Sequence, residues 1–348
     1  MSNLQIGLAI AGGLVLAAMV GHSAWSTSRN RPRQPVAPAP EDVHVTGHEF
    51  GSGIEPELDA AAFELAHFPL AAPEAKPVLD ALIDVIAPIE LDAPVSGDAA
   101  LAAMPATRRA GSKPFFIEGY CESRQCWETP AAGQRYSTFQ SGVQLANRSG
   151  ALNDIEYSEF VMKTQAFADA INGTPDFPEM REEVARAREL DQFASEHDAQ
   201  LGFVLRARNA AWSPGYVQQN ASRLGFVAGV IPGRMVVPAS SPGLPAVLGL
   251  SFNTQAAMAD DPALSAIREL AISLDVAQVD RNEHAFARMR DAARTLAQSM
   301  DGSVTDDNGV GLSIEAMEQI GRELELLYDR LDERDLSAGS AAARRLFS

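Results

Sequence analysis

The sequence predicts an α+β protein, in which an antiparallel-rich sheet carries helices on one face. Two observations favour this fold class. Strand-like and helix-like segments mix along the chain without a strict β-α-β alternation, and residues 269–279 alternate apolar and polar side chains with a period of two, which is typical of a half-buried strand. A third observation, a long apolar stretch near the N-terminus, places one transmembrane helix and a disordered linker before the folded part.

Residues 78–199 are predicted to form a first α+β domain. Residues 113–120 and 142–146 are rich in β-branched and aromatic side chains, as strands usually are. Residues 181–197 are predicted to form an amphipathic helix, because their apolar side chains recur on one face and charges cover the other.

Residues 200–335 are predicted to form a second α+β domain, and residues 336–348 a flexible tail. Ser213 is a typical N-cap, and it is followed by Pro214 at the first helical position and by Gly225 beyond the helix end. The predicted strands are residues 201–206, 226–231, 234–238, 247–252, 269–279 and 303–306. The predicted helices are residues 213–224, 282–300 and 313–331.

The two domains look like divergent copies of one unit. The segment that begins at Gly142 parallels the segment that begins at Gly249, and the helix around Arg181 then parallels the helix around Arg288. The offset is about 107–117 residues, which indicates a tandem duplication.

Residues 153–171 have two interpretations. The cap signal at Asn153, the acidic residues after it and Gly173 at the far end favour a single helix. The alignment of the two copies instead requires a strand near residues 160–164. Periodicity alone leaves both alternatives open.

Residues 4–25, from Leu4 to Trp25, form a segment that suits a lipid bilayer. It contains no Asp, Glu, Lys or Arg, and as a helix it reaches about 33 Å, enough for a hydrocarbon core of about 30 Å. Arg29, Arg31 and Arg33 follow it, and no Lys or Arg precedes it. The positive-inside rule then leaves the N-terminus outside and the large C-terminal part in the cytoplasm. Residues 1–28 are therefore predicted to be a transmembrane anchor.

Two further interpretations of this segment stay open. A signal peptide cut near Ala24 is the alternative to an anchor, although signal peptides have a basic start and a shorter apolar core of about 7–15 residues. Small residues at a spacing of four, Ala9, Gly13 and Ala17, would let two such helices associate.

Residues 29–77 are predicted to form a disordered linker. Between residues 34 and 107 the chain has thirteen acidic residues and a single lysine, Lys76, and proline and alanine are frequent there. Such a composition buries too little apolar surface to offset the loss of chain entropy. The net charge of −18 also disfavours nucleic-acid binding, because phosphates repel an acidic chain.

The sequence contains no pattern that indicates catalysis, a cofactor or a metal site. Cys121 and Cys126 are close in the chain, but a zinc site needs two further ligands and the six histidines are scattered. Two reduced thiols are the simpler interpretation. Asp306 and Asp307 precede an Asn-Gly pair, so this acidic pair indicates a turn.

Several strings in residues 200–335 resemble one known family. They are SRLGFVAGVIPGRMVVPASSPGLPAVLGLSF, AISLDVAQV, HAFARMRDAARTLAQSMDGSVTDDNG and SIEAMEQIGRELELL. In sequence and in element order they resemble the C-terminal domain of the ZipA family, membrane-anchored cell-division proteins that bind FtsZ. The predicted N-terminal anchor and acidic linker agree with the architecture of that family.

The resemblance implies a sheet whose exposed apolar face receives the C-terminal tail of FtsZ, while helices cover the other face. Carried over by position, it implies that the tail contacts Leu201, Phe203, Leu205, Ile231, Gly233, Asn253, Gln255, Ala271 and Ser273. Gly233, Asn253 and Ser273 stand where the family has bulkier side chains. Three alternatives follow: weaker binding, a site shifted along the sheet, or a site on the other copy, where Val161 lies near the place of Ser273.

The sequence therefore predicts a bitopic adaptor, without enzymatic activity, that ties FtsZ polymer to the bacterial inner membrane at midcell. One alternative is a membrane-anchored scaffold or sensor whose two domains bind another protein or a small ligand. Another is a periplasmic domain that signal cleavage releases.

Overall fold

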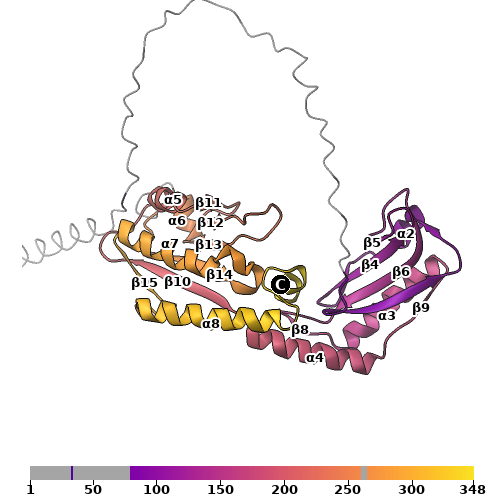
Figure 1. Cartoon of the computed structure of the whole chain (residues 1–348). Coiled ribbons are helices and arrows are strands. Elements are labelled where there is room, and N and C mark those ends of the chain that lie inside the picture. The colour runs from indigo at the N-terminus through magenta and orange to yellow at the C-terminus, as the bar shows by residue number, and fades with distance from the viewer. Residues whose placement is uncertain (1–32, 34–78, 260–264) are drawn as a thin grey trace, which may run out of the picture. The chain divides into compact units, whose positions relative to one another are not determined.

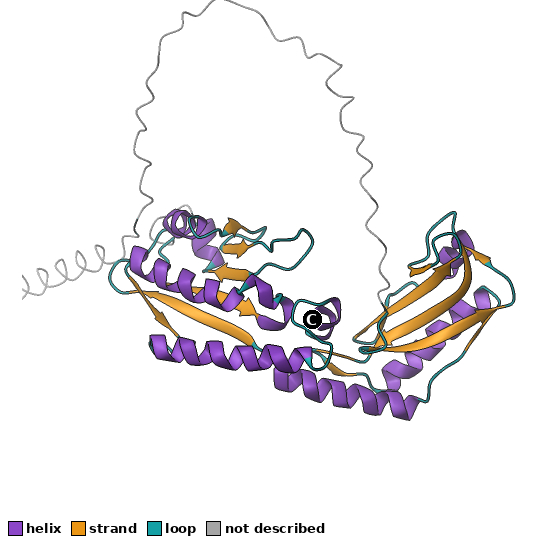
Figure 2. Cartoon of the chain, in the orientation of Figure 1, coloured by secondary structure: helices purple, strands orange, loops and turns teal. Residues whose placement is uncertain are grey.

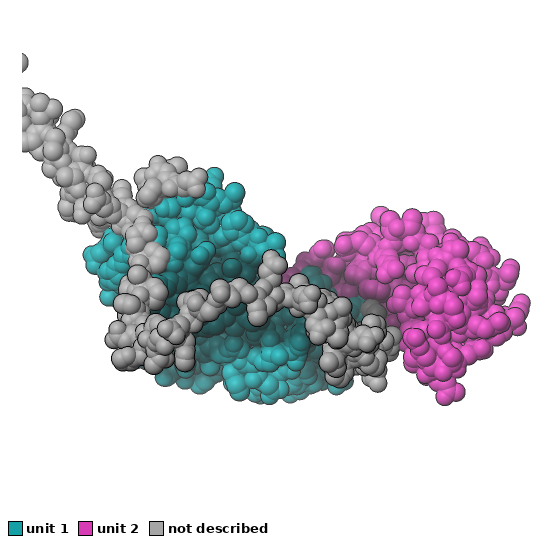
Figure 3. All heavy atoms as spheres, turned by 90° about the horizontal axis from the view of Figure 1, so that it is seen from above, with its two compact units in different colours: residues 1–36, 193–348 teal, residues 37–192 magenta. Residues whose placement is uncertain are grey.

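The chain divides into two units, which are coloured separately in Figure 3. Unit 1 comprises residues 1–36 and 193–348, and unit 2 comprises residues 37–192. Each unit combines an antiparallel sheet with helices, which confirms the predicted α+β class (Figure 2).

The computed structural model describes Arg33, residues 79–259 and residues 265–348. The predicted anchor, residues 1–28, lies outside these residues, and so does the predicted linker except for Arg33. Within the described part of the chain, no helix combines the length and apolarity that crossing a membrane requires.

Unit 2 is built on a sheet with the strand order β3-β4-β6-β1-β9 (Figure 1). In it β1 (Asp84–Leu91) lies between β6 (Arg135–Gln144) and the short β9 (Gly173–Pro175), antiparallel to both. Helix α3 (Asp154–Ala170) packs on one face, where the rings of Phe139 and Phe167 lie 5.4 Å apart. The other elements are β2 (Val95–Ser96), α2 (Gly97–Ala103), β3 (Arg109–Ala110), β4 (Lys113–Cys121), β5 (Cys126–Glu128), β7 (Ala146–Asn147), β8 (Gly150–Ala151) and α4 (Met180–His197).

Helix α3 decides between the two interpretations of residues 153–171. The Asn153 side chain accepts hydrogen bonds from the backbone N–H groups of Ile155 and Glu156, and the Glu156 carboxylate accepts one from Asn153 N–H, which forms a complete capping box. Phe160 is fully buried against the sheet. The alternative of a strand near residues 160–164 is therefore wrong.

Unit 1 is built on a sheet with the order β11-β12-β13-β14-β10-β15. Its central pair is β10 (Gln200–Ala207) and β14 (Glu269–Asp275), which are antiparallel in the register Phe203↔Ile272. The other elements are α5 (Pro214–Ser222), β11 (Val227–Ala228), β12 (Arg234–Val237), β13 (Leu248–Ser251), α6 (Thr254–Met258), η2 (Val276–Gln278), η3 (Arg281–Glu283), α7 (Ala285–Met300), β15 (Gly302–Thr305), α8 (Ile314–Asp332) and α9 (Ala341–Leu346).

Two predicted strands of unit 1 are longer than the observed ones. The strand predicted at residues 226–231 is reduced to β11, because Arg234 N–H bonds to Ile231 O and Gly229 N–H to Arg234 O, closing a turn. The strand predicted at residues 269–279 ends at Asp275, where a 3₁₀ turn begins.

The two units share one topology. In each, the first strand is hydrogen-bonded between a strand that precedes the long helix and the strand that follows it: β1 between β6 and β9, and β10 between β14 and β15. Two long helices follow along the chain in each case: α3 and α4 after β6, and α7 and α8 after β14. The predicted alignment, which set the helix at Arg181 against the helix at Arg288, is therefore wrong; α3 is the counterpart of α7.

The boundary between the units falls inside α4, between Gln192 and Phe193, and not at residue 199 as predicted. Val184 and Leu190, in the first part of the helix, are buried. Phe193, in the last part, stacks on His197 at 4.2 Å and lies under the Arg334 guanidinium at 4.8 Å. The first part of α4 is thus assigned to unit 2 and its last part to unit 1.

Arg33 joins unit 1 at Trp212, although the sequence assigned it to a disordered linker. Its N–H donates to Ala211 O at 2.7 Å, and its carbonyl accepts from Ser213 N–H at 3.0 Å. Its guanidinium pairs with Asp301 at 3.0 Å. Trp212 itself is fully buried and donates its indole N–H to Met300 O, so this contact is made to a rigid part of the unit.

The C-terminal residues are packed into unit 1, which contradicts the predicted flexible tail at residues 336–348. Leu336, Leu346 and Phe347 are essentially fully buried. The Gln278 side-chain amide donates to Phe347 O at 2.7 Å, and Gly339 N–H donates to the carbonyl of Ala277. The prediction failed because a short alanine- and arginine-rich sequence gives no sign of the apolar surface it covers.

Removal of residues 336–348 should therefore destabilise unit 1 by several kcal/mol, because each buried Leu or Phe side chain contributes about 1.5–3 kcal/mol. Chemical denaturation monitored by circular dichroism measures this. Removal of the exposed Ser348 alone is the matched control and should leave the unfolding midpoint unchanged. Equal midpoints for both truncations would contradict the packing of α9.

Candidate functional site

One face of the unit 1 sheet is covered by helices. Phe203, Leu205 and Ile272 point to this face and are buried. The ring of Phe203 contacts Phe286 of α7 at a centroid distance of 6.2 Å, which places α7 on the same side. Because strand side chains alternate, the next residue along each strand must point to the opposite face.

The opposite face is open, and small side chains form its centre. Gly202, Ser273 and Gly249 are direct neighbours across β10, β14 and β13. Gly202 and Ser273 are exposed, and Gly249 is half-buried. A Cβ atom at Gly249 would lie only 2.7 Å from Ser273 Oγ, so the serine side chain lies against this glycine.

A second row and an apolar border complete this open face. Val204, Ala271 and Ser251 are neighbours on the same three strands, and all are half-buried. Val236 of β12 and Val227 of the edge strand β11 extend the face outward, and Val227 is 50% exposed. The face therefore offers a neutral, weakly apolar surface that extends over five strands, from β10 to β11.

Charged groups flank this surface at one end. Arg206 of β10 pairs loosely with Glu269 of β14 at 3.8 Å, and both side chains are largely exposed. Asp307 reaches over from the turn after β15, and its Oδ1 would lie 3.4 Å from a Cβ atom at Gly202. Asp306 Oδ1 accepts from Val310 N–H at 2.7 Å, so the acidic pair forms a turn, as predicted. A ligand on the open face would thus meet both signs of charge at this end.

The residues that the sequence assigned to the site fall into three groups. Ala271 and Ser273 lie on the open face. Phe203 and Leu205, together with the half-buried Leu201, point to the helix-covered face, so their assignment to an exposed surface is wrong. The physical reason is the pairing register, which a single strand sequence does not reveal.

The four remaining predicted residues lie outside the strands. Ile231 is 52% exposed in the turn between β11 and β12. Gly233 follows it with a φ of +78°, and a Cβ atom there would lie 2.7 Å from Phe252 O, so this glycine serves the backbone. Asn253 caps α6 by accepting from Gln255 N–H at 2.8 Å, and Gln255 is exposed in the first turn.

Sequence reasoning missed most of the open face. The missed residues are Gly202, Val204, Val236, Gly249 and Ser251. For Gly202, Gly249 and Ser251 the signal was the small side chain between bulky residues in LGFVLR and LGLS, but bulky residues draw attention first when a binding surface is expected. The alternative site near Val161 does not exist in that form, because Val161 lies on helix α3 and not on a strand.

A groove of about 370 Å³ lies on the other side of unit 1, between α7 and α8. Phe286, Met317 and Tyr328 line it, and burial raises the pKa of Tyr328. Arg281 at its rim pairs with Asp329 at 2.9 Å and with Glu325. These ion pairs join η3, which precedes α7, to α8, so we assign the groove to the packing of these elements.

The two cysteines lie opposite each other across the β4–β5 hairpin, and both are free thiols. Cys121 is buried, and its Sγ lies 3.2 Å from Ser123 Oγ. Over the residues that the structure describes, His, Cys, Asp and Glu side chains form no group of three that could hold a metal ion.

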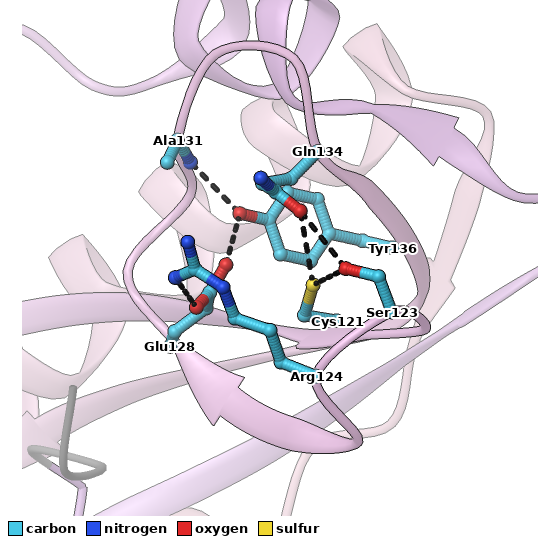
Figure 4. A network of polar contacts seen from close by, with 7 residues as sticks. All are labelled: Cys121, Ser123, Arg124, Glu128, Ala131, Gln134 and Tyr136. Carbon is cyan, nitrogen blue, oxygen red and sulfur yellow. Dashed lines mark hydrogen bonds and ion pairs between the residues drawn. The ribbon is translucent and has the colours of Figure 1, made fainter. Parts of the chain in front are cut away.

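A polar network surrounds this hairpin (Figure 4). The Tyr136 hydroxyl donates to Glu128 Oε1 at 3.0 Å and accepts from Ala131 N–H at 2.8 Å. Arg124 pairs with the other oxygen of Glu128 at 2.8 Å. Burial raises the pKa of Tyr136 to about 12, so the hydroxyl keeps its proton at physiological pH. The network therefore links β5 to β6 and to the turn between β4 and β5.

Comparison with known proteins finds one family model that matches part of unit 1. Residues 258–323 match the family model described as "ZipA, C-terminal FtsZ-binding domain", which confirms the ZipA resemblance over this stretch. No curated protein matches the chain. Among solved structures, the chain is similar to a variant of berberine bridge enzyme in complex with (S)-reticuline, at 9% identity and a TM-score of 0.16. That similarity covers 75% of this chain and 52% of the enzyme, and with so low a TM-score it carries no argument.

The face assignment predicts opposite outcomes for two neighbouring residues of β10. Phe203→Ala should destabilise unit 1 by about 3–5 kcal/mol, because it leaves a cavity under α7. Val204→Ala, on the open face, should cost about 1 kcal/mol or less. Urea denaturation of both variants checks this, and similar costs at the two positions would overturn the assignment.

Proposed function

We propose that this ZipA-like chain binds FtsZ through the open face of unit 1. The observation that carries the proposal is the position of that face: Ala271 and Ser273 lie on β14, inside the stretch that matches the FtsZ-binding family. The face is exposed, neutral at its centre and bordered by valines. An extended or helical peptide segment is the natural occupant of such a shallow surface.

The small side chains of the face determine how such a segment would be held. Gly202, Ser273 and Gly249 have no bulky side chain, so the bulky groups of the interface have to come from the partner. A few apolar anchor side chains of the FtsZ tail would then carry most of the binding energy. This arrangement differs from the one implied by sequence, in which Phe203 and Leu205 supplied the bulk.

The proposal includes attachment to the inner membrane through residues 4–25, with the folded units in the cytoplasm. Arg33 lies eight residues beyond Trp25, and an extended chain covers at most about 3.6 Å per residue, or about 29 Å in all. The contact of Arg33 with Trp212 would thus hold unit 1 close to the bilayer instead of at the end of a long tether. FtsZ bound there gains a high effective concentration at the membrane.

Ser273→Arg should weaken FtsZ binding at least about tenfold, equivalent to about 1.4 kcal/mol, because it fills the centre of the open face with a charged side chain. Full-length protein in nanodiscs, titrated with intact FtsZ and with FtsZ lacking its C-terminal tail, measures this. Ser222→Arg is the matched control, since Ser222 is exposed at the end of α5. Equal binding of tailed and tailless FtsZ would refute the proposed mode.

The proposed topology makes a separate prediction. Protease added to intact spheroplasts should leave both units undigested, whereas the same protease should cleave them after the membrane is broken. Immunoblotting for the C-terminus measures this. Digestion in intact spheroplasts would place the units outside the inner membrane and rule out contact with FtsZ.

A further inference from the structure

Unit 2 has a counterpart of the open face, and the pairing register identifies its centre. In unit 1 the central row is Gly202, Ser273 and Gly249. In unit 2 the corresponding row across β1, β6 and β4 is Ile86, Gly142 and Phe116. Gly142 lies on the sheet face opposite α3, because the side chain of its neighbour Ser141 points to α3 and hydrogen-bonds Thr164 there at 2.8 Å. Ser273 likewise lies on the face opposite α7.

In unit 2 this position is occupied by the chain itself. Leu79, which precedes β1, is only 8% exposed. A Cβ atom at Gly142 would overlap Leu79 Cδ2, so the leucine side chain rests directly on this glycine. The absence of a side chain at Gly142 is therefore what makes room for Leu79.

Polar contacts hold the same segment in place. Leu79 N–H donates to Glu118 Oε1 at 3.2 Å, and the Gln140 side-chain amide donates to Glu118 Oε2 at 2.9 Å. Glu118 is 1% exposed, although it lies on the face opposite α3. A tight turn follows, in which Asp80 N–H bonds to Asp84 Oδ2 at 2.8 Å. The sheet thus holds this segment through an apolar contact of Leu79 with Gly142 and a hydrogen bond from the Leu79 backbone to Glu118. A bound peptide would make contacts of the same two kinds.

We propose that unit 2 carries a second face that receives a peptide, and that Leu79 of its own entering segment closes it. The ligand chemistry is an aliphatic side chain placed over Gly142 and a peptide N–H presented to Glu118. At the position of Glu118, unit 1 has Ser251, so the two faces select different peptides. Taken together with the proposed function, on which this part rests, each chain would bind one FtsZ tail, through unit 1.

The test compares the full-length wild type with Leu79→Ala and Leu79→Asp. Ile155→Asp is the matched control, since Ile155 is 81% exposed in unit 2. Hydrogen exchange monitored by mass spectrometry follows the amides of residues 79–83, and the dye ANS reports exposed apolar surface. We expect at least about tenfold faster exchange of these amides in both Leu79 variants, with increased ANS fluorescence and unchanged secondary structure.

A peptide with the sequence of residues 75–83, added to the Leu79 variants, should displace the dye, and it should have no effect on the wild type. Unchanged exchange in Leu79→Ala, or dye binding that the peptide does not reverse, would overturn the inference. The FtsZ titration is scored separately. If the wild type binds no FtsZ tail but the exchange and dye results appear, the proposed function fails and the closure of unit 2 stands.

Discussion

The antiparallel pairing of β10 with β14 is the constraint on which the rest of unit 1 depends. Its register sets Phe203 beside Ile272 and Gly202 beside Ser273. Since side chains alternate along a strand, the bulky residues of both strands meet on one face and the small ones on the other. The bulky face packs against α7 and becomes the core, and the small face stays exposed.

The same framework has two different outcomes in one chain. In unit 1 the position of Ser273 stays exposed, whereas in unit 2 the equivalent Gly142 lies under Leu79. The difference comes from the segment before the first strand, which in unit 2 folds back through the Asp80–Asp84 turn contact. In unit 1 only Asp198 and Ala199 separate α4 from the first strand, so this connection is too short to cover the sheet. Topology alone therefore does not make a face available; the connection that enters it matters as well.

The chain connections also shape how the proposed adaptor would work. Arg33 attaches the region next to the predicted anchor to unit 1, through two backbone hydrogen bonds and an ion pair with Asp301. The C-terminal helix α9 closes the core of the same unit at Leu346 and Phe347. Both ends of the described chain thus stabilise the unit that carries the open face, which gives the proposed binding surface a firm support.

Local signals in the sequence were sufficient for several elements. The cap at Ser213 and the period-two pattern that begins at residue 269 act over a few residues, so the sequence by itself determined α5, β14 and the α+β class, and local strings pointed to the ZipA family. The cap at Asn153 favoured a helix, but only the tertiary structure excluded a strand near residues 160–164. The tertiary structure alone decided which face of each strand is exposed, that residues 336–348 are packed, and that Leu79 covers Gly142. These depend on hydrogen-bond register and contacts between segments far apart in the chain, and no local pattern of residues encodes them.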